Sequence, residues 1–442
     1  MNNKWIVQLG DDFLKDLLFG LKIFKKARGL ASIIILTLAI GIGTTTTIFS
    51  VFKGVLLSPL PYENSKRLVS LSLSFPNSGF SSIPRYLFDE LKKESGSFDG
   101  LYGEAFWPGV MSELDTPIRF YGHQVSEDML STLGLSTYIG RDFGKDDFIP
   151  GNDNVVILSY RLWNSHFQGN RDILNKFVNI DEKSYSVIGV MPPEYLSRPI
   201  IDPTVFSPSA GPFTEFDKNN SYHRVVGRLK DGVTTDSARE ELSILRERLQ
   251  ERYPGLPDTW RFACEPLKDT IVGDFRGLLW ILLGSVGVLL IISCVNVANL
   301  LLAHSTTRHK EFSLRLALGA SRWRLFRQLF AENLVLSFAG MVAGVVFAYL
   351  ILQVLVAHLP LSLPRAHEIK MDTWVLVFSM FLMLAASLGF GIAPALRVVD
   401  KNLSQEINSG IRGSVVSGGG KRIRSVLVII EFSLALILLL SA

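Results

Sequence analysis

The sequence has little that would support a disulfide framework or a nucleic-acid-binding surface. It contains 2 cysteines in 442 residues, and Cys294 lies inside an apolar run that Cys264 precedes, so we expect no disulfide between them. Charged residues make up 19% of the chain, and the net charge is only +4. A net charge this small argues against a protein that binds nucleic acid through a basic face.

The motifs of common nucleotide-binding and catalytic sites are also missing. A P-loop requires G-x-x-x-x-G-K-[ST], whereas residues 418–421 (GGGK) lack both the spacing and the hydroxyl and are typical of a flexible linker. The 7 histidines are scattered, and neither H-E-x-x-H nor G-x-S-x-G occurs. Four aspartates lack the calcium-loop spacing, which favours a solvated loop: Asp142, Asp146, Asp147 and Asp153. We therefore predict a chain that is not an enzyme and binds neither a metal nor a cofactor.

Apolar residues, in contrast, are abundant. They make up 48% of the chain, and the mean hydropathy is +0.28, which indicates a membrane protein. A spanning helix needs about 20 apolar residues. The runs that predict spans are 30–56, 278–303, 333–358, 374–396 and 426–442, the last of which we expect to be an incomplete fifth span. The first run lacks an A-x-A-like exit, which favours an uncleaved signal anchor over a signal peptide.

Residues 57–277 have the composition of a soluble domain. Strand-like alternation occurs at 67–74 and 184–190, and helical spacing occurs at 83–94 and 235–253. A segment of this length is a domain rather than a loop. The predicted fold class is therefore an α-helical membrane protein with a large extracytoplasmic mixed α/β domain between its first two spans.

The distribution of basic residues predicts the topology. Segments 1–29, 304–332 and 397–425 each carry six Lys or Arg, whereas the connection at 359–373 carries two. The positive-inside rule places the three basic segments in the cytoplasm, and it places 57–277 and 359–373 outside. Segment 1–29 is also amphipathic, which predicts a helix parallel to the membrane.

Within the second cytoplasmic segment, Arg308–Leu329 is basic and amphipathic. It carries six cations against one acid, Glu311, and apolar residues recur at near-helical spacing. The pattern predicts a helix at the membrane surface, which would anchor the chain to anionic lipid or be held by a partner.

Four motifs, taken in order, resemble the permeases of the MacB/FtsX type of ABC transporter. Three lie in the external domain, namely LGLSTYIGRDF (133–143), the stretch from VVILSYRLW to VMPPEY (155–195) and RVVGRLKDGVTTDSAREEL (224–242). The fourth, from CVNVANLLL to RWRLFRQL (294–329), is similar to the permease core. The resemblance implies a MacB-type periplasmic core domain and an inner-membrane location. The chain departs from the family pattern at Asn175, where Gly is usual, and at His304, where Arg is common.

Two further stretches are most similar to the duplicated orphan permeases of this family. They are LAIGIGTTTTIFSVFKGVLLSPLPY (38–62) and RIRSVLVIIEFSLALILLLSA (422–442). Those permeases contain two copies of the unit, so the resemblance implies that the second stretch begins a second copy.

The resemblance also implies that the basic segment is a coupling helix held in a groove of a separate ATPase. The spacing of Arg308, Glu311 and Arg315 places an acid and two bases on one helical face, and Gly319-Ala320 permits close backbone approach. The alternative is that the cations only enforce topology. The candidate coupling residues are Arg308, Glu311, Phe312, Arg315, Leu316, Gly319, Ala320 and Arg322.

A second set of residues is predicted to pack the helices. It consists of small or amide side chains inside the spans, which permit close approach or seek partners on a neighbouring helix: Gly41, Gly43, Asn296, Asn299, Gly340 and Gly344. For the two asparagines a structural role is favoured over substrate contact. A homodimer seam at Gly340 and Gly344 is a further alternative. Glu431 would snorkel or pair with a cation of the bundle.

Two functional hypotheses follow. The first is a permease subunit that converts the motion of a separate ABC ATPase into a change of the external domain, in efflux or envelope remodelling. The second is a membrane-anchored scaffold or sensor that works without an ATPase. Expected partners are the ATPase, the lipid bilayer, a second permease half or second copy, and an extracytoplasmic protein, but not nucleic acid.

Overall fold

The computed structural model describes residues 28–76, 79–112, 117–195, 203–210, 221–307, 314–315, 318–319, 321–358 and 369–399, together with 429 and 433. These residues divide into two compact units. The sheet unit is Ser58–Arg276, and the helical unit comprises the described residues before and after it. Three predicted segments lie wholly or almost wholly outside the described residues: 1–29, 397–425 and 426–442, which includes Glu431.

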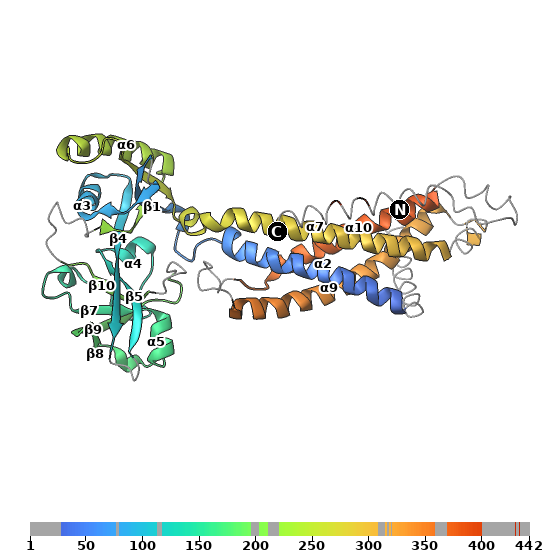
Figure 1. The fold of residues 1–442 in the computed structure, drawn as a ribbon, viewed down its shortest axis with the longest axis horizontal. Helices are drawn as coiled ribbons and strands as arrows, with labels where there is room; N and C mark the ends of the chain where they lie inside the picture. Colours follow the sequence, from blue (N-terminus) through green and yellow to red (C-terminus); the bar gives the residue numbers. More distant parts are fainter. Residues whose placement is uncertain are drawn as a thin grey trace, which may run out of the picture. The chain divides into compact units, whose positions relative to one another are not determined.

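The sheet unit is built on an 11-stranded mixed sheet (Figure 1). The strand order is β13-β1-β12-β4-β5-β10-β7-β9-β6, with β2 beside β1 and β8 beside β4 and β9. Pairing is antiparallel except at β10–β5 and β7–β9. A separate pair joins β3 and β11. The strands are β1 (Leu68–Phe75), β2 (Gly79–Ser81), β3 (Ile83–Pro84), β4 (Phe98–Met111), β5 (Ile118–Val125), β6 (Ile139–Gly140), β7 (Val155–Leu158), β8 (Phe177–Ile180), β9 (Lys183–Val190), β10 (Pro203–Pro208), β11 (Ser221–Tyr222), β12 (Arg224–Leu229) and β13 (Arg261–Pro266).

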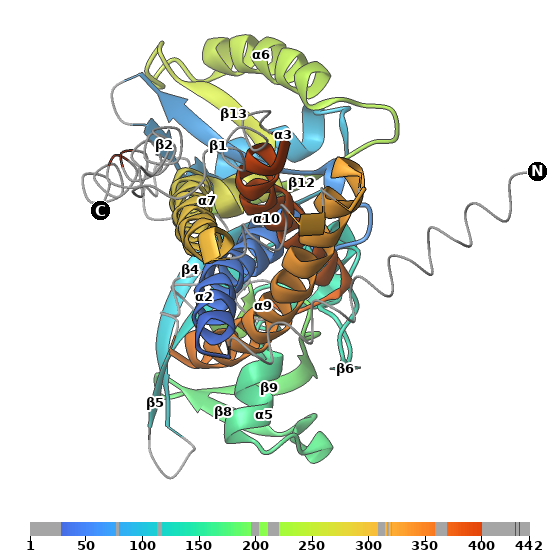
Figure 2. The ribbon, with the colours of Figure 1, turned by 90° about the vertical axis from the view of Figure 1, so that its right-hand side faces the viewer.

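The helices of this unit cover the sheet with their apolar faces. They are α3 (Arg85–Glu94), α4 (Met129–Leu133), α5 (Tyr160–His166) and α6 (Thr235–Arg252), with short 3₁₀ turns at Ser65–Arg67, Lys145–Phe148 and Arg171–Ile173. Buried side chains of α3 and α6 share one core with β1, β12 and β13. Those of α5 share another with β7, β8 and β9, and Figure 2 shows β8 and β9 beside that helix. The longest strand, β4, contributes residues to both of these cores and, through Tyr102, to a third core that includes α4.

Local sequence accounts for the helix boundaries. Helix α6 matches the predicted 235–253 segment, and the side chain of Thr234 accepts a hydrogen bond from the Ser237 backbone N–H at 3.1 Å, which caps its first turn. The predicted helix at 83–94 is wrong at its start. Ile83 pairs with Tyr222 as a strand, and the helix begins only after Pro84, which fits a proline at the end of an extended segment.

The helical unit contains four long helices. They are α2 (Arg28–Phe52), which ends in a π-helical turn at Lys53–Leu57, α7 (Leu267–Thr307), whose first part belongs to the sheet unit, α9 (Arg322–His358) and α10 (Thr373–Val399). Among the described residues, three helical stretches are long and apolar enough to span a membrane: Arg28–Leu57, Phe275–His304 and Arg327–Leu355. A shorter apolar stretch is Thr373–Gly389.

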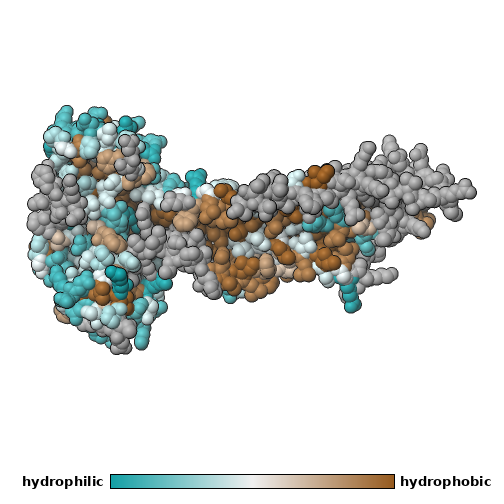
Figure 3. Space-filling view, in the orientation of Figure 1, coloured by the Kyte–Doolittle hydropathy of each residue, from teal (hydrophilic) through white to brown (hydrophobic). Residues whose placement is uncertain are grey.

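These helices pack around a small interior and expose apolar side chains outward. Figure 2 looks along the helices and shows α2 beside α7, α9 and α10, and residues from all four form the core, among them Ile34, Leu290, Leu336 and Leu382. Figure 3 shows hydrophobic side chains on the visible face of this unit. Trp374 is 69% exposed and Phe381 is 63% exposed. Such a surface is stable in hydrocarbon rather than in water.

Candidate functional site

Two pairs of glycines lie where α2 contacts its neighbours. A Cβ atom built on Gly43 would lie 2.7 Å from the backbone oxygen of Gly344 in α9, and one built on Gly340 would lie 2.7 Å from the Leu38 Cβ. At Gly41 the Cβ would lie 2.8 Å from the Ser293 hydroxyl of α7. Real Cβ atoms do not approach so closely. The backbones of α2 and α9 therefore meet at Gly43 and Gly344, whereas Gly41 and Gly340 leave space for the side chains of Ser293 and Leu38.

Hydroxyl groups join the same helices inside the unit. Thr46 Oγ1 lies 3.0 Å from Ser379 Oγ of α10, and Thr45 Oγ1 donates to the backbone oxygen of Val286 in α7 at 3.1 Å. Asn296 is partly buried, and Asn299 Oδ1 is shielded from solvent without a hydrogen-bond partner among the described residues. The structure thus links α2 to α7 and α10 through threonines rather than through these amides.

A chain of hydrogen bonds joins Arg315, in the part of the basic segment before α9, to two residues of α9. Arg315 Nη1 donates to Gln328 Oε1 at 2.8 Å, and Gln328 Nε2 donates to Glu332 Oε1 at 3.0 Å. Gln328 and Glu332 are 8% and 4% exposed. Because buried polar groups need partners, these three side chains hold the segment and the helix together.

The remaining candidate coupling residues are placed only in part. Gly319 has φ +92°, a left-handed conformation that suits glycine, and it precedes α9. The side chain of Ser321 caps α9 by accepting from the Arg324 N–H at 3.3 Å. Arg308, Glu311, Phe312, Leu316 and Ala320 lie outside the described residues, as does the side chain of Arg322.

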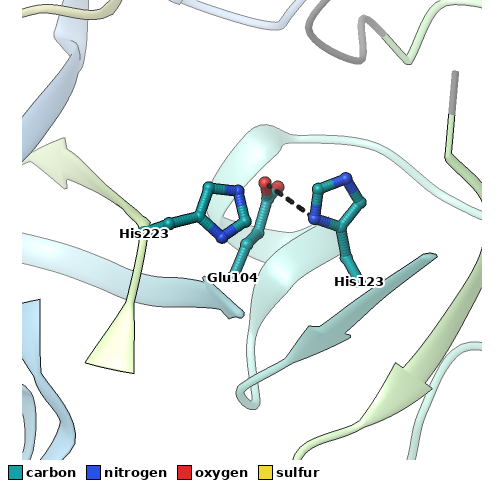
Figure 4. A group of neighbouring side chains, drawn as sticks. All are labelled: Glu104, His123 and His223. Atoms are coloured by element: carbon teal, nitrogen blue, oxygen red, sulfur yellow. Dashed lines mark ion pairs between the residues drawn. The ribbon is translucent and has the colours of Figure 1, made fainter. Parts of the chain in front are cut away.

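The sheet unit contains a buried ionic cluster centred on Glu104 in β4, which is 1% exposed (Figure 4). The hydroxyls of Tyr102 and Tyr195 donate to its Oε1 at 3.2 and 2.9 Å. Its Oε2 lies 3.7 Å from Arg224 Nη1 and 3.9 Å from His123 Nδ1. Strand pairing sets this geometry, because Arg224 is the cross-strand partner of Glu104 in the β12–β4 ladder.

The electrostatics of the cluster favour a charged pair. Burial opposes the charge of Glu104, but the Arg224 guanidinium and, to a smaller degree, the two histidines hold the pKa of the carboxyl below its ordinary value. Burial also opposes the charge on Arg224, and the Glu104 carboxylate raises the pKa of that guanidinium overall. Burial lowers the pKa of His123 despite the nearby carboxylate. The cluster therefore combines an ionised Glu–Arg pair with a histidine whose neutral form is favoured.

Sequence reasoning did not identify this cluster. The histidines are far apart along the chain, yet the rings of His123 and His223 stack at 5.3 Å between centroids. Gln328 and Glu332 were also missed, although polar residues four apart beside an apolar run are a signal that could have found them. No spacing rule could have found the cluster, because its members meet only through long-range strand pairing.

Comparison with known families agrees with this architecture. The model of the MacB-like periplasmic core domain matches residues 31–245, and the model of the FtsX-like permease C-terminal region matches residues 283–403. The first match contains most of α2 and most of the sheet unit, and the second contains most of the apolar part of α7, together with α9 and α10.

Individual relatives are more distant. The chain is 24% identical over 302 residues to the macrolide export ATP-binding/permease protein MacB of Campylobacter jejuni, covering 66% of this chain and 45% of that protein. It is 22% identical over 348 residues to the protein of that name from Campylobacter fetus, covering 77% and 53%. The chain therefore spans about half the length of these relatives.

Solved structures are similar at low identity. The periplasmic region of MacB from Actinobacillus actinomycetemcomitans matches with a TM-score of 0.36 and 14% identity, over 51% of this chain and 95% of that structure. The family of the chain is instead shown by the two family models. They match successive segments of the chain, first most of the sheet unit and then the apolar helices. This chain belongs to the MacB/FtsX-type permease family.

Proposed function

We propose that this chain is the transmembrane permease subunit of a mechanotransmission-type ABC transporter. In this proposal it lies in the inner membrane, with its basic segments in the cytoplasm and the sheet unit outside. A separate ATPase would supply ATP hydrolysis, because no P-loop occurs in the sequence. The observation that carries the proposal is the Arg315–Gln328–Glu332 chain of hydrogen bonds between the basic segment and α9.

The proposed mechanism is a mechanical one. ATP binding would draw two ATPase subunits together and displace the segment that contains Glu311 and Arg315. Gln328 and Glu332 would pass this displacement to α9, and the close contact of Gly344 with Gly43 would pass it to α2. Close-packed interfaces transmit such shifts because they have no space in which to absorb them. The sheet unit, which follows α2 in the chain, would then act on a substrate outside the membrane, in efflux or envelope remodelling.

Charge reversal at the basic segment tests the ATPase contact. We expect the E311K/R315E variant to lose most of its co-purification with an ATPase encoded beside its gene, because both reversals place like charges against the partner. K401E, a reversal in another basic segment, serves as the control and should co-purify like the wild type. Undiminished co-purification of E311K/R315E would contradict the coupling role. An ATP-independent scaffold or sensor would then be the better account.

Transmission can be separated from docking by substituting Gln328. We expect Q328L to keep the ATPase bound within about twofold but to abolish ATP-dependent distance changes between spin labels on the sheet unit, because leucine removes both hydrogen bonds of the chain. Q353L is a matched control, since Gln353 lies on the same helix and its amide donates to the Tyr349 hydroxyl at an exposed site. Equal distance changes in Q328L and Q353L would exclude this route.

A further inference from the structure

Three ligand-type side chains converge in the sheet unit from three strands or strand ends. Glu104 comes from β4, His123 from β5, and His223 from the residue between β11 and β12. One ligand atom from each lies within 4.8 Å of the others. Figure 4 shows both imidazole rings beside the carboxylate of Glu104. We propose that these three residues bind a zinc ion, which is a role beyond the proposed permease function and contrary to the sequence-based expectation of no metal.

The strongest independent observation is the state of His123. Its side chain is 7% exposed, and its Nδ1 atom is shielded from solvent without a hydrogen-bond partner among the described residues. This nitrogen is directed at Glu104 Oε2 but remains 3.9 Å away, too far for a hydrogen bond. A buried ring nitrogen without a partner is costly, and an ion placed between it and the carboxylate would satisfy it.

The surroundings hold the candidate ligands in position. Two tyrosine hydroxyls donate to Glu104 Oε1, which orients the carboxylate and leaves Oε2 directed at His123. The His123 ring is stacked between those of Phe206 and His223, at 5.9 and 5.3 Å. The backbone N–H of His223 donates to the backbone oxygen of Glu104 at 2.9 Å. Hydrogen bonds of this kind around ligands are a regular part of metal sites.

The ligand set selects the metal. Two imidazole nitrogens and one carboxylate oxygen suit zinc, and three protein ligands leave a fourth position for water or another molecule. Ligand atoms around a tetrahedral zinc ion at roughly 2.0–2.2 Å lie about 3.4 Å apart. The present separations of up to 4.8 Å must therefore contract, and His223 is the exposed residue of the three.

Arg224 is the charge that opposes binding. Its guanidinium lies 3.7 Å from Glu104 Oε2 and already offsets the carboxylate charge. Zinc and Arg224 would compete for the same oxygen, so we expect moderate affinity and a displacement of the guanidinium when the metal binds.

Zinc titration of the full chain in detergent tests the proposal. After treatment with a chelator, we expect the wild type to take up one zinc ion per chain in competition with a chromogenic indicator. X-ray absorption should report imidazole and oxygen ligands. H123A and H223A should each bind zinc at least about tenfold more weakly, since each removes one of three protein ligands.

The control is His166, an exposed histidine that is hydrogen-bonded to Ser165. H166A should bind zinc like the wild type. All variants should show wild-type circular dichroism without metal, which separates ligand loss from misfolding. Zinc uptake that is absent from the wild type, or equal in wild type, H123A and H223A, would overturn the proposal.

Discussion

R224M should destabilise the sheet unit more than any other single substitution considered for it. Arg224 is the cation nearest to Glu104, and Glu104 is 1% exposed. Removing the guanidinium leaves a buried carboxylate without its counter-charge, which costs about 3–5 kcal/mol of the free energy of unfolding. Urea unfolding of the full chain, followed by hydrogen exchange in peptides from β4 and β12, would measure the loss.

A double variant tells whether the lost charge is the cause. In E104Q/R224M both charges are absent, so most of the loss in R224M should be recovered. R248M is the matched control, because the exposed side chain of Arg248 pairs with Glu94 at 3.4 Å, and an exposed pair contributes at most about 1 kcal/mol. If R224M unfolded like R248M, the charge of Glu104 would have to be compensated by something other than Arg224.

The second large effect is expected in the helical unit at Gly344. A Cβ built there would lie 3.0 Å from the Ala39 backbone oxygen and 3.1 Å from the Gly43 nitrogen. These are backbone atoms of α2 that cannot rotate away. G344A should therefore destabilise the helical unit moderately and G344L by about 3 kcal/mol or more, as overpacking does. The measurement is the fraction of monodisperse protein in size-exclusion chromatography after heating in detergent.

G284L distinguishes a packing clash from a general effect of leucine in a membrane helix. Gly284 lies in α7, and nothing lies within 4 Å of a Cβ built there. We expect G284L to remain monodisperse to the same temperature as the wild type. Similar losses in G344L and G284L would refute the close α2–α9 contact as the cause.

Sequence predicts the helices better than the sheet for a physical reason. Apolar runs and stripes are local, so the helices α2, α6, α9 and α10 could be located approximately from the chain alone. The start of α7 at Leu267 could not be located in this way, because the first turns of this helix precede the apolar run. Leu267 and Val272 in these turns are buried in the sheet unit. The strand order depends on pairings such as Leu71 with Cys264, which no local pattern specifies.

The candidate sites show a similar division. The glycines of α2 and α9 could be found from the sequence because small residues inside an apolar run commonly mark close contact with a neighbouring helix. The contact of Arg315 with Gln328 was not, because it depends on how the chain turns between 315 and α9. The Glu104 cluster was the hardest site to predict from the sequence. Its residues come from separate strands, and one of them, Tyr195, comes from a connecting segment.

The π-helical turn at Lys53–Leu57 changes how α2 should be probed. A π turn accommodates one residue more than an α turn, and one residue corresponds to about 100° around the helix axis. A single helical wheel drawn over Arg28–Leu57 would thus assign the side chains after Lys53 to the wrong neighbours. Cysteine cross-linking pairs chosen within this turn, at Gly54–Leu57, must be shifted by one position relative to those chosen before it.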